Sequence, residues 1–349
     1  MFIFNKIKNF FDFLLSLKFN KTQFLVNKCK DFIKETRIKL NDLSKTNFDL
    51  GVHHLNKGNL NDAILRFKLV KRFGHQYDDL DYFLGRCYLE KLKYSKAKIL
   101  FENYIIKNNP KFSEEAKYCI NITDNKLHNI KSIPIGIVDH KLNQKFDSYV
   151  KMAKAFQNKK NTQNIIYEKI KEALENNDKV FNYNMLDLGC NLGIVAYLLR
   201  KNQLLHFSLG IEINKNMIKY CKELTIDSNK VYNTVVNKDI CTFLASKKQT
   251  DSKFDIILGT HFITYSTDLK SLFTKLKEYI NANGIMTFSF SAKSQEVNYI
   301  FDRKLETFIY DKDYVVKTVK SCGWQVINDE EVQSKKEPYP QVIIVLKLS

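Results

Sequence analysis

The second half of the chain alternates between short apolar runs and longer amphipathic stretches. Lysine-rich stretches such as TQNIIYEKIKEALENN separate most of the runs and carry their apolar residues at helical spacing. Strands that alternate with helices predict a doubly wound, mostly parallel sheet. Because no helix fits between the last two runs, we expect them to close the sheet as an antiparallel hairpin. The apolar runs lie at 184–188, 206–213, 231–236, 254–259, 284–291, 323–328 and 341–348.

The first half contains an internal repeat with a spacing of 34 residues, from Leu50 to Leu84. LGVHHLNKGNLNDAILRF (50–67) matches LGRCYLEKLKYSKAKILF (84–101), with Leu, Gly, Ala and Phe at equivalent positions. Small residues that let paired helices approach, followed by an aromatic residue, are typical of helix–turn–helix repeats. Residues 47–110 resemble tetratricopeptide repeats, which implies a helical domain that recruits a protein partner or substrate. A chance pair of amphipathic hairpins is the alternative.

Residues 1–40 also have apolar side chains at helical spacing, with lysines between them. We expect either a helix packed under the repeats or, through residues 1–20, a basic amphipathic helix on an anionic membrane surface. No apolar run approaches the roughly 20 residues that a membrane-spanning helix needs. The pattern divides the chain into N-terminal helices (1–46), helical repeats (47–130) and an α/β domain (131–349).

Composition and charge narrow the functional classes. The formal net charge of +18 would suit a nucleic-acid partner, but the lysines are spread evenly and only the N-terminus has a local excess. The seven cysteines form no CxxC pair, which favours reduced thiols in a cytoplasmic protein over disulfides or a zinc site. We therefore expect no metal and no nucleic-acid groove.

The stretch NMLDLGCNLGIVAYLL (184–199) predicts a buried strand, a glycine turn and a helix. It does not fit the dinucleotide fingerprint GxGxxG, because Asn191 and Ile194 occupy the later glycine positions. With Asp187, Gly189 and Gly193 it instead resembles the acid-x-Gly-x-Gly-x-Gly motif of class I methyltransferases, with Asn191 replacing the middle glycine. Asn tolerates left-handed backbone, so we expect the turn to survive this replacement.

The resemblance implies S-adenosylmethionine as the cofactor, and it implies that Asn191 and Gly193 of this turn belong to the cofactor-binding residues. Bare backbone at Gly189 would lie against its methionine part, and Asp187 would face its ammonium group directly or through water. We expect Cys190, within the same turn, to line the cofactor as a space filler rather than a nucleophile. Glu212 and Ile213 end the second strand, where in this family the carboxylate accepts hydrogen bonds from the ribose hydroxyls.

Later segments continue the resemblance over residues 183–291 in the same order and spacing. Asp239 and the backbone NH of Ile240 are expected to contact the adenine edge. Gly259, Thr260 and His261 should line the methyl side of the pocket, with His261 as the candidate general base and a pocket or core role as the alternative.

KFDSYV (145–150) resembles a segment of bacterial methyltransferases that carry tetratricopeptide repeats before the catalytic domain. The likeness implies a helix that folds over the cofactor with Tyr149.

We therefore predict a methyltransferase that acts on an oxygen or nitrogen atom of a protein or small molecule. The alternative is a repeat-based interaction protein with a decayed methyltransferase domain. Asn191 favours that alternative, whereas the preserved carboxylates oppose it. A membrane-surface enzyme that acts on a lipid is a third candidate. Nucleic-acid methylation is disfavoured because GTHF replaces the Asn/Asp-Pro-Pro-aromatic motif, and no proline precedes a cysteine.

Overall fold

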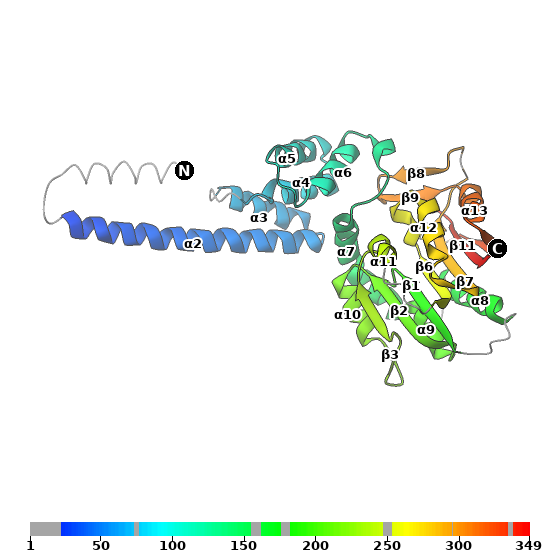
Figure 1. The fold of residues 1–349 in the computed structure, drawn as a ribbon. Coiled ribbons are helices and arrows are strands. Elements are labelled where there is room, and N and C mark those ends of the chain that lie inside the picture. The colour runs from blue at the N-terminus through cyan, green and yellow to red at the C-terminus, as the bar shows by residue number, and fades with distance from the viewer. Residues whose placement is uncertain are drawn as a thin grey trace. The chain divides into compact units, whose positions relative to one another are not determined.

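The computed structural model describes residues 22–72, 77–154, 162–175, 182–246, 253–294, 296–333 and 338–349. The chain forms two compact units that divide between Asn125 and Lys126 (Figure 1). The predicted amphipathic segment 1–20 lies outside the described residues. None of the described helices is long and apolar enough to cross a membrane.

The first unit is helical, and both copies of the 34-residue repeat fold into helical hairpins. A Cβ atom on Gly51 would lie 2.6 Å from the ring of Phe67, and one on Gly85 would lie 2.9 Å from the ring of Phe101. The glycine of each copy therefore lets an aromatic ring from the next helix pack against its backbone, which explains why both residue types recur together. The helices are α2 (Thr22–Asn56), α3 (Leu60–Arg72), α4 (Leu80–Glu90), α5 (Tyr94–Ile106) and α6 (Ser113–Thr123).

The second unit is built on a seven-stranded sheet in the order β10-β11-β7-β6-β1-β2-β5. β11 runs antiparallel to both of its neighbours, and the other pairs in the centre of the sheet are parallel. The predictions of a parallel sheet and a closing antiparallel hairpin are confirmed. The strands are β1 (Tyr183–Leu188), β2 (Leu205–Glu212), β5 (Thr234–Asn237), β6 (Phe254–Thr260), β7 (Ile280–Ser291), β10 (Trp324–Val332) and β11 (Gln341–Leu348).

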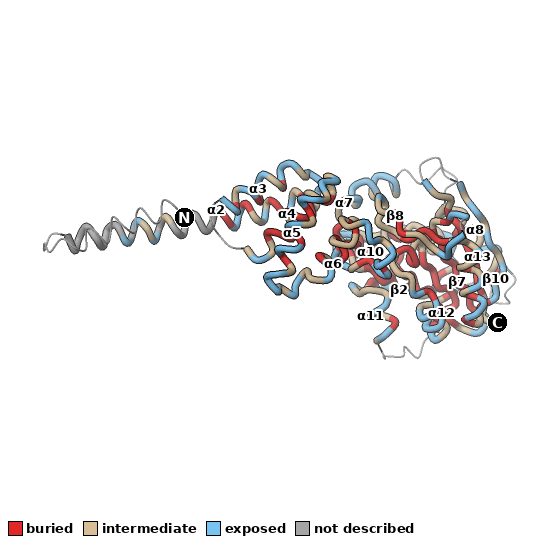
Figure 2. Tube along the Cα trace, turned by 90° about the horizontal axis from the view of Figure 1, so that it is seen from above, coloured by how far each residue is buried: buried red, intermediate tan, exposed pale blue. Residues whose placement is uncertain are grey.

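Helices cover both faces of this sheet, and buried residues concentrate along its strands (Figure 2). On one face α8, α9 and α10 pack against the strands through residues such as Ile170, Ala196 and Ile218. On the other, Phe273 of α12 lies 5.1 Å, between ring centres, from Phe288 of β7. The helices are α7 (Ile135–Lys154), α8 (Thr162–Glu175), α9 (Ile194–Lys201), α10 (Lys215–Glu223), α11 (Ile240–Ala245), α12 (Leu269–Leu276) and α13 (Lys312–Ser321).

The strand order places a topological switch point at β1. The chain proceeds from β1 to β2 and β5 on one side, then returns to β6 and β7 on the other. Ligands of doubly wound sheets bind at the carboxyl ends of the strands beside such a point.

Short elements complete the unit. The β8–β9 hairpin between β7 and α13 was not expected from the sequence. These elements are η1 (Leu127–Asn129), β3 (Thr225–Ile226), β4 (Asn229–Lys230), η3 (Phe262–Tyr265), β8 (Tyr299–Asp302) and β9 (Thr307–Tyr310).

Candidate functional site

The turn after β1 has the left-handed backbone that its sequence requires. Gly189, Asn191 and Gly193 have φ angles of +70°, +50° and +68°. The backbone N–H groups of Gly189 and Cys190 donate to the carbonyl of Ile211 at 2.9 and 3.1 Å, which holds the turn against β2. The Asn191 side chain donates to the Gly189 carbonyl at 2.8 Å. Asn191 thus adopts the conformation that a glycine would take, and the tight turn is kept.

Glu212 lies beneath this turn at the end of β2 and is 3% exposed. Its Oε2 atom accepts a hydrogen bond from the Asn191 N–H at 3.0 Å. Its Oε1 atom accepts from the N–H groups of Ile213 and Asn214 at 2.8 and 3.0 Å. Burial raises the pKa of Glu212, and the backbone hydrogen bonds act in the opposite direction. The carboxylate therefore ties the turn to the end of β2, and its remaining lone-pair capacity is limited.

Asp187 lies at the centre of the sheet, in register with Gly210 of β2 and Leu258 of β6. It is 2% exposed, and its Oδ2 atom accepts a hydrogen bond from the Tyr232 hydroxyl at 2.6 Å. Its Oδ1 atom is buried and has no hydrogen-bond partner. Burial raises the pKa of Asp187 to about 7, with the Tyr232 hydrogen bond lowering it and the Glu212 charge raising it further.

The structure brings the Gly189 backbone and α11 together. The nearest atom to a Cβ built on Gly189 would be Cδ1 of Ile240, at an ordinary contact distance of 3.8 Å. Asp239 caps α11, because its Oδ2 atom accepts from the Thr242 N–H at 2.7 Å. The predicted methionine-side and adenine-side residues are therefore neighbours.

Two other residues of the turn, Gly193 and Cys190, pack against the interior of the unit. A Cβ on Gly193 would lie 2.7 Å from the ring of Tyr232, so this glycine makes room for a protein side chain. Cys190 is buried in the core, with its Sγ atom 3.9 Å from Sγ of Cys221. The side chain of Cys190 thus fills space beneath the turn.

At the end of β6, Gly259 packs closely against an aromatic ring and His261 has a left-handed backbone conformation. A Cβ on Gly259 would lie 2.5 Å from the ring of Phe262. Thr260 follows in register with Ser289 of β7. His261 has a φ angle of +58°, and its carbonyl accepts from the Thr264 hydroxyl at 2.6 Å. Desolvation lowers the pKa of the half-buried His261 to about 4, so its imidazole is neutral at physiological pH and a weak proton acceptor.

Helix α7 is fastened to the same edge of the sheet. The Asn214 side chain donates to Asp139 at 2.8 Å and to Asn143 at 2.9 Å, and both acceptors lie on α7. Burial raises the pKa of Tyr265 in η3, and the nearby Tyr149 of α7 and Glu212 raise it further. The Tyr265 hydroxyl thus lies within electrostatic range of both groups.

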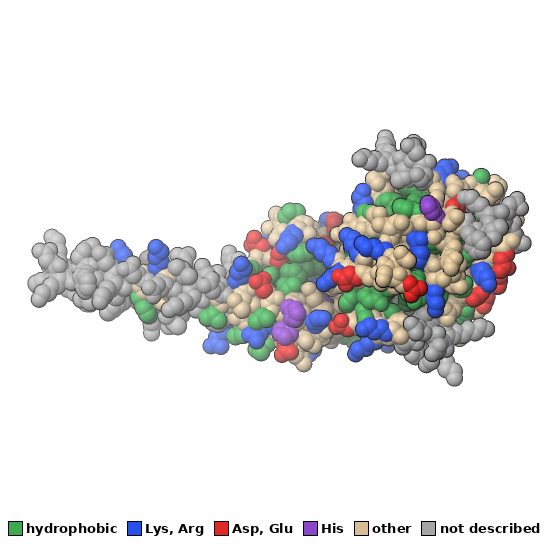
Figure 3. Space-filling model, turned by 90° about the horizontal axis from the view of Figure 1, so that it is seen from below, with side chains coloured by type: hydrophobic (Ala, Val, Ile, Leu, Met, Phe, Trp, Pro, Cys, Tyr) green, Lys and Arg blue, Asp and Glu red, His purple; other side chains and the backbone are tan. Residues whose placement is uncertain are grey.

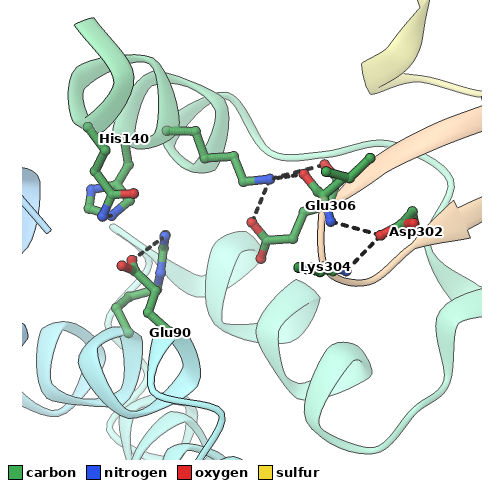
Figure 4. Close-up of polar contacts among 9 residues, drawn as sticks. Glu90, His140, Asp302, Lys304 and Glu306 are labelled. Carbon is green, nitrogen blue, oxygen red and sulfur yellow. Dashed lines mark hydrogen bonds and ion pairs between the residues drawn. The ribbon is translucent and has the colours of Figure 1, made fainter. Parts of the chain in front are cut away.

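A second attachment joins α7 to the β8–β9 turn. Lys141 donates to the Leu305 carbonyl at 2.5 Å and pairs with the Glu306 carboxylate at 2.7 Å (Figure 4). The Asp302 carboxylate accepts from the N–H groups of Lys304 and Leu305, which shapes this turn.

Sequence reasoning missed three parts of this arrangement: Tyr232, Asn214 and the β8–β9 hairpin. Asn214 had a local signal, because Asn is a preferred N-cap residue and here accepts from the Asn216 and Met217 N–H groups. Tyr232 had none.

The second unit is a doubly wound α/β domain with a candidate ligand site beside its switch point. Residues 179–308 match a family model described as a methyltransferase domain. This part of the chain is therefore similar to methyltransferase domains.

Solved structures to which this chain is similar include a SAM-dependent methyltransferase from Leishmania major, with 15% identity and a TM-score of 0.43 over 53% of this chain and 72% of that chain. Another is magnesium protoporphyrin IX methyltransferase from Synechocystis PCC 6803 with bound SAM. It has 13% identity and a TM-score of 0.45 over 61% of this chain and 96% of that chain. No curated protein matches the chain.

Proposed function

We propose that the protein is an S-adenosylmethionine-dependent methyltransferase that methylates an oxygen or nitrogen atom of its acceptor. The methyltransferase domain matched at residues 179–308 supports this proposal. The observation that carries it is the Oδ1 atom of Asp187, which is buried without a hydrogen-bond partner at the switch point of the sheet. A buried carboxylate oxygen without a partner is costly unless a ligand satisfies it.

The residues at this edge fit S-adenosylmethionine. Its methionine part carries an ammonium group, for which the free oxygen of Asp187 is a suitable acceptor. Gly189 has no side chain between its backbone and a ligand, and Ile240 supplies an apolar neighbour. Glu212 would hold the ribose with its remaining acceptor capacity, and Asp239 with the Ile240 N–H would contact the adenine.

When bound, the cofactor supplies a methyl group that is already activated by its sulfonium. The residues of the chain then have to orient the acceptor and exclude water. Helix α7 is attached at Asn214 and at Glu306, which suits it to cover the site with Tyr149. The low pKa of His261 makes orientation and neutral hydrogen bonding a better role for it than strong general-base catalysis.

We also propose that the helical repeats recruit a protein partner or substrate. The recurring contacts Gly51/Phe67 and Gly85/Phe101 support the repeat architecture, and helical repeats in general present an extended surface to a binding partner. The face shown in Figure 3 does not favour nucleic acid, because its described Lys and Arg side chains lie interspersed with Asp and Glu. Contact of residues 1–20 with a membrane surface stays a prediction.

Calorimetric titration of the full chain with S-adenosylmethionine and S-adenosylhomocysteine tests the proposal. We expect saturable binding by the wild type and strongly weakened binding by Asp187→Ala and Glu212→Ala. Glu223→Ala is the matched control, because Glu223 is exposed on α10. A folded wild type that binds neither compound would contradict the proposal and favour the repeat-based interaction protein.

A further inference from the structure

Tyr232 is a buried residue that the proposed reaction does not obviously need. It lies just before β5 and is 2% exposed. Its hydroxyl donates to Oδ2 of Asp187 at 2.6 Å, although 45 positions separate the two residues in the chain. A buried tyrosine hydroxyl on a buried carboxylate is a strong, charge-assisted contact when the acid is ionised.

Two glycines from different elements make room for this ring. A Cβ on Gly193, at the start of α9, would lie 2.7 Å from Cε2 of Tyr232. A Cβ on Gly210, in β2, would lie 3.0 Å from Sγ of Cys190 and 3.2 Å from Cε1 of Tyr232. The ring therefore fits closely between the turn and the sheet, and its hydroxyl has a fixed direction toward Asp187.

We infer that Tyr232 is a positioning residue for cofactor binding: it holds Asp187 by one oxygen, leaves the other for the ammonium group of S-adenosylmethionine, and favours the ionised carboxyl. The inference rests on the proposed function. It assigns Gly193 and Gly210 the task of accommodating Tyr232.

The groups that face Asp187 explain why one hydroxyl matters. Glu212, at the end of β2, opposes ionisation of Asp187 through its charge. Cys190 in the turn and Cys221 on α10 are buried thiols. Among these described neighbours Tyr232 is the group that stabilises the charged form of Asp187. A protonated Asp187 would offer the ammonium group a weaker acceptor, so affinity for it should rise with pH until Asp187 is ionised in the free protein.

The test is calorimetric titration of the full chain with S-adenosylhomocysteine at several values from about pH 6 to about pH 8.5, which bracket the pKa of Asp187. The second ligand is 5′-methylthioadenosine, which lacks the amino-acid tail. For the wild type we expect the affinity for S-adenosylhomocysteine to rise by up to about tenfold per pH unit and then level off. The affinity for methylthioadenosine should be independent of pH.

Tyr232→Phe keeps the ring and removes the donor. We expect it to move the pH midpoint of S-adenosylhomocysteine binding upward by about one unit, which weakens binding at neutral pH about tenfold. Methylthioadenosine should bind as it does to the wild type. Tyr279→Phe is the matched control, because it removes another buried hydroxyl of the same unit, which donates to the Leu244 carbonyl. Asp187→Asn, which cannot ionise, should bind S-adenosylhomocysteine weakly and without pH dependence.

Two results would overturn the inference. An unchanged pH midpoint in Tyr232→Phe would show that the hydroxyl does not act on Asp187. Equal weakening of both ligands would show that Tyr232 only supports the fold. Failure of the wild type to bind either ligand would instead contradict the proposed function itself.

Discussion

Replacement of Glu212 by glutamine should destabilise the second unit, because this carboxylate accepts three backbone hydrogen bonds. Glutamine keeps one oxygen, which can still face the N–H groups of Ile213 and Asn214, at 2.8 and 3.0 Å from the native carboxylate. Its NH₂ group would then face the N–H of Asn191, which now lies 3.0 Å from Oε2. A buried donor without an acceptor costs about 1–3 kcal/mol, and the two remaining hydrogen bonds lose their ionic partner.

Glutamine also removes a buried charge, which offsets part of this cost. We therefore expect Glu212→Gln to lower the free energy of unfolding by about 1–3 kcal/mol at mildly alkaline pH. Urea unfolding followed by tryptophan fluorescence measures this loss in the correct unit, since the single tryptophan, Trp324, is buried there. Glu223→Gln, on the exposed face of α10, should stay within about 0.5 kcal/mol of the wild type. If Glu212→Gln matched that control, the carboxylate would not hold the turn, and our account of Asn191 would be wrong.

Three further outcomes are expected. Gly193→Ala should lower the free energy of unfolding by about 1–3 kcal/mol more than Gly323→Ala, as measured by urea unfolding. Both glycines have positive φ angles, but only Gly193 faces an aromatic ring. Equal losses in the two variants would contradict the packing of Tyr232 against Gly193. Relative to the wild type, the free energy of unfolding of Asp187→Asn should rise by about 1 kcal/mol for each pH unit between about pH 5 and pH 7. The raised pKa of Asp187 favours its protonated form in the folded state, so wild-type stability falls as pH rises through about 7; parallel pH profiles would refute this. Phe101→Ala should lower the free energy of unfolding of the helical unit by about 3–5 kcal/mol, because Phe101 is fully buried. Unfolding monitored by circular dichroism measures this loss. A loss below about 1 kcal/mol would contradict the place of Phe101 in the core.

The sheet could be predicted from the sequence because its central strands are buried on both faces. Residues 254–259 and 341–348 form nearly continuous apolar runs, which is how central strands of a covered sheet read. The turn after β1 was predictable for a local reason, since its glycines and Asn191 all need positive φ angles.

The contacts that organise the site were harder to predict because they join distant segments. The pairing of Tyr232 with Asp187 leaves no mark on either local sequence. The β8–β9 hairpin turns at Glu306 with a φ of +47°, without the glycine or asparagine that would have indicated a turn. The attachment of Lys141 to that turn spans 165 positions and could not be inferred before the fold.

Gly193 shows the same difference between a local sequence signal and a contact with a distant segment. Gly193 was expected to contact the cofactor, and its position at the first turn of α9 agrees with the motif. The structure gives the missing side chain another purpose, because the ring of Tyr232 occupies that space. A motif can therefore fix where a glycine occurs without revealing which neighbour requires it.

Hydrogen exchange of the full chain with and without S-adenosylmethionine tests the central claim most directly. We predict slower exchange at the turn of residues 187–193, at the end of β2 and at the start of α11, with helices α3 to α5 unchanged. Protection confined to other segments, or none at saturating cofactor, would contradict a cofactor site at the carboxyl end of β1.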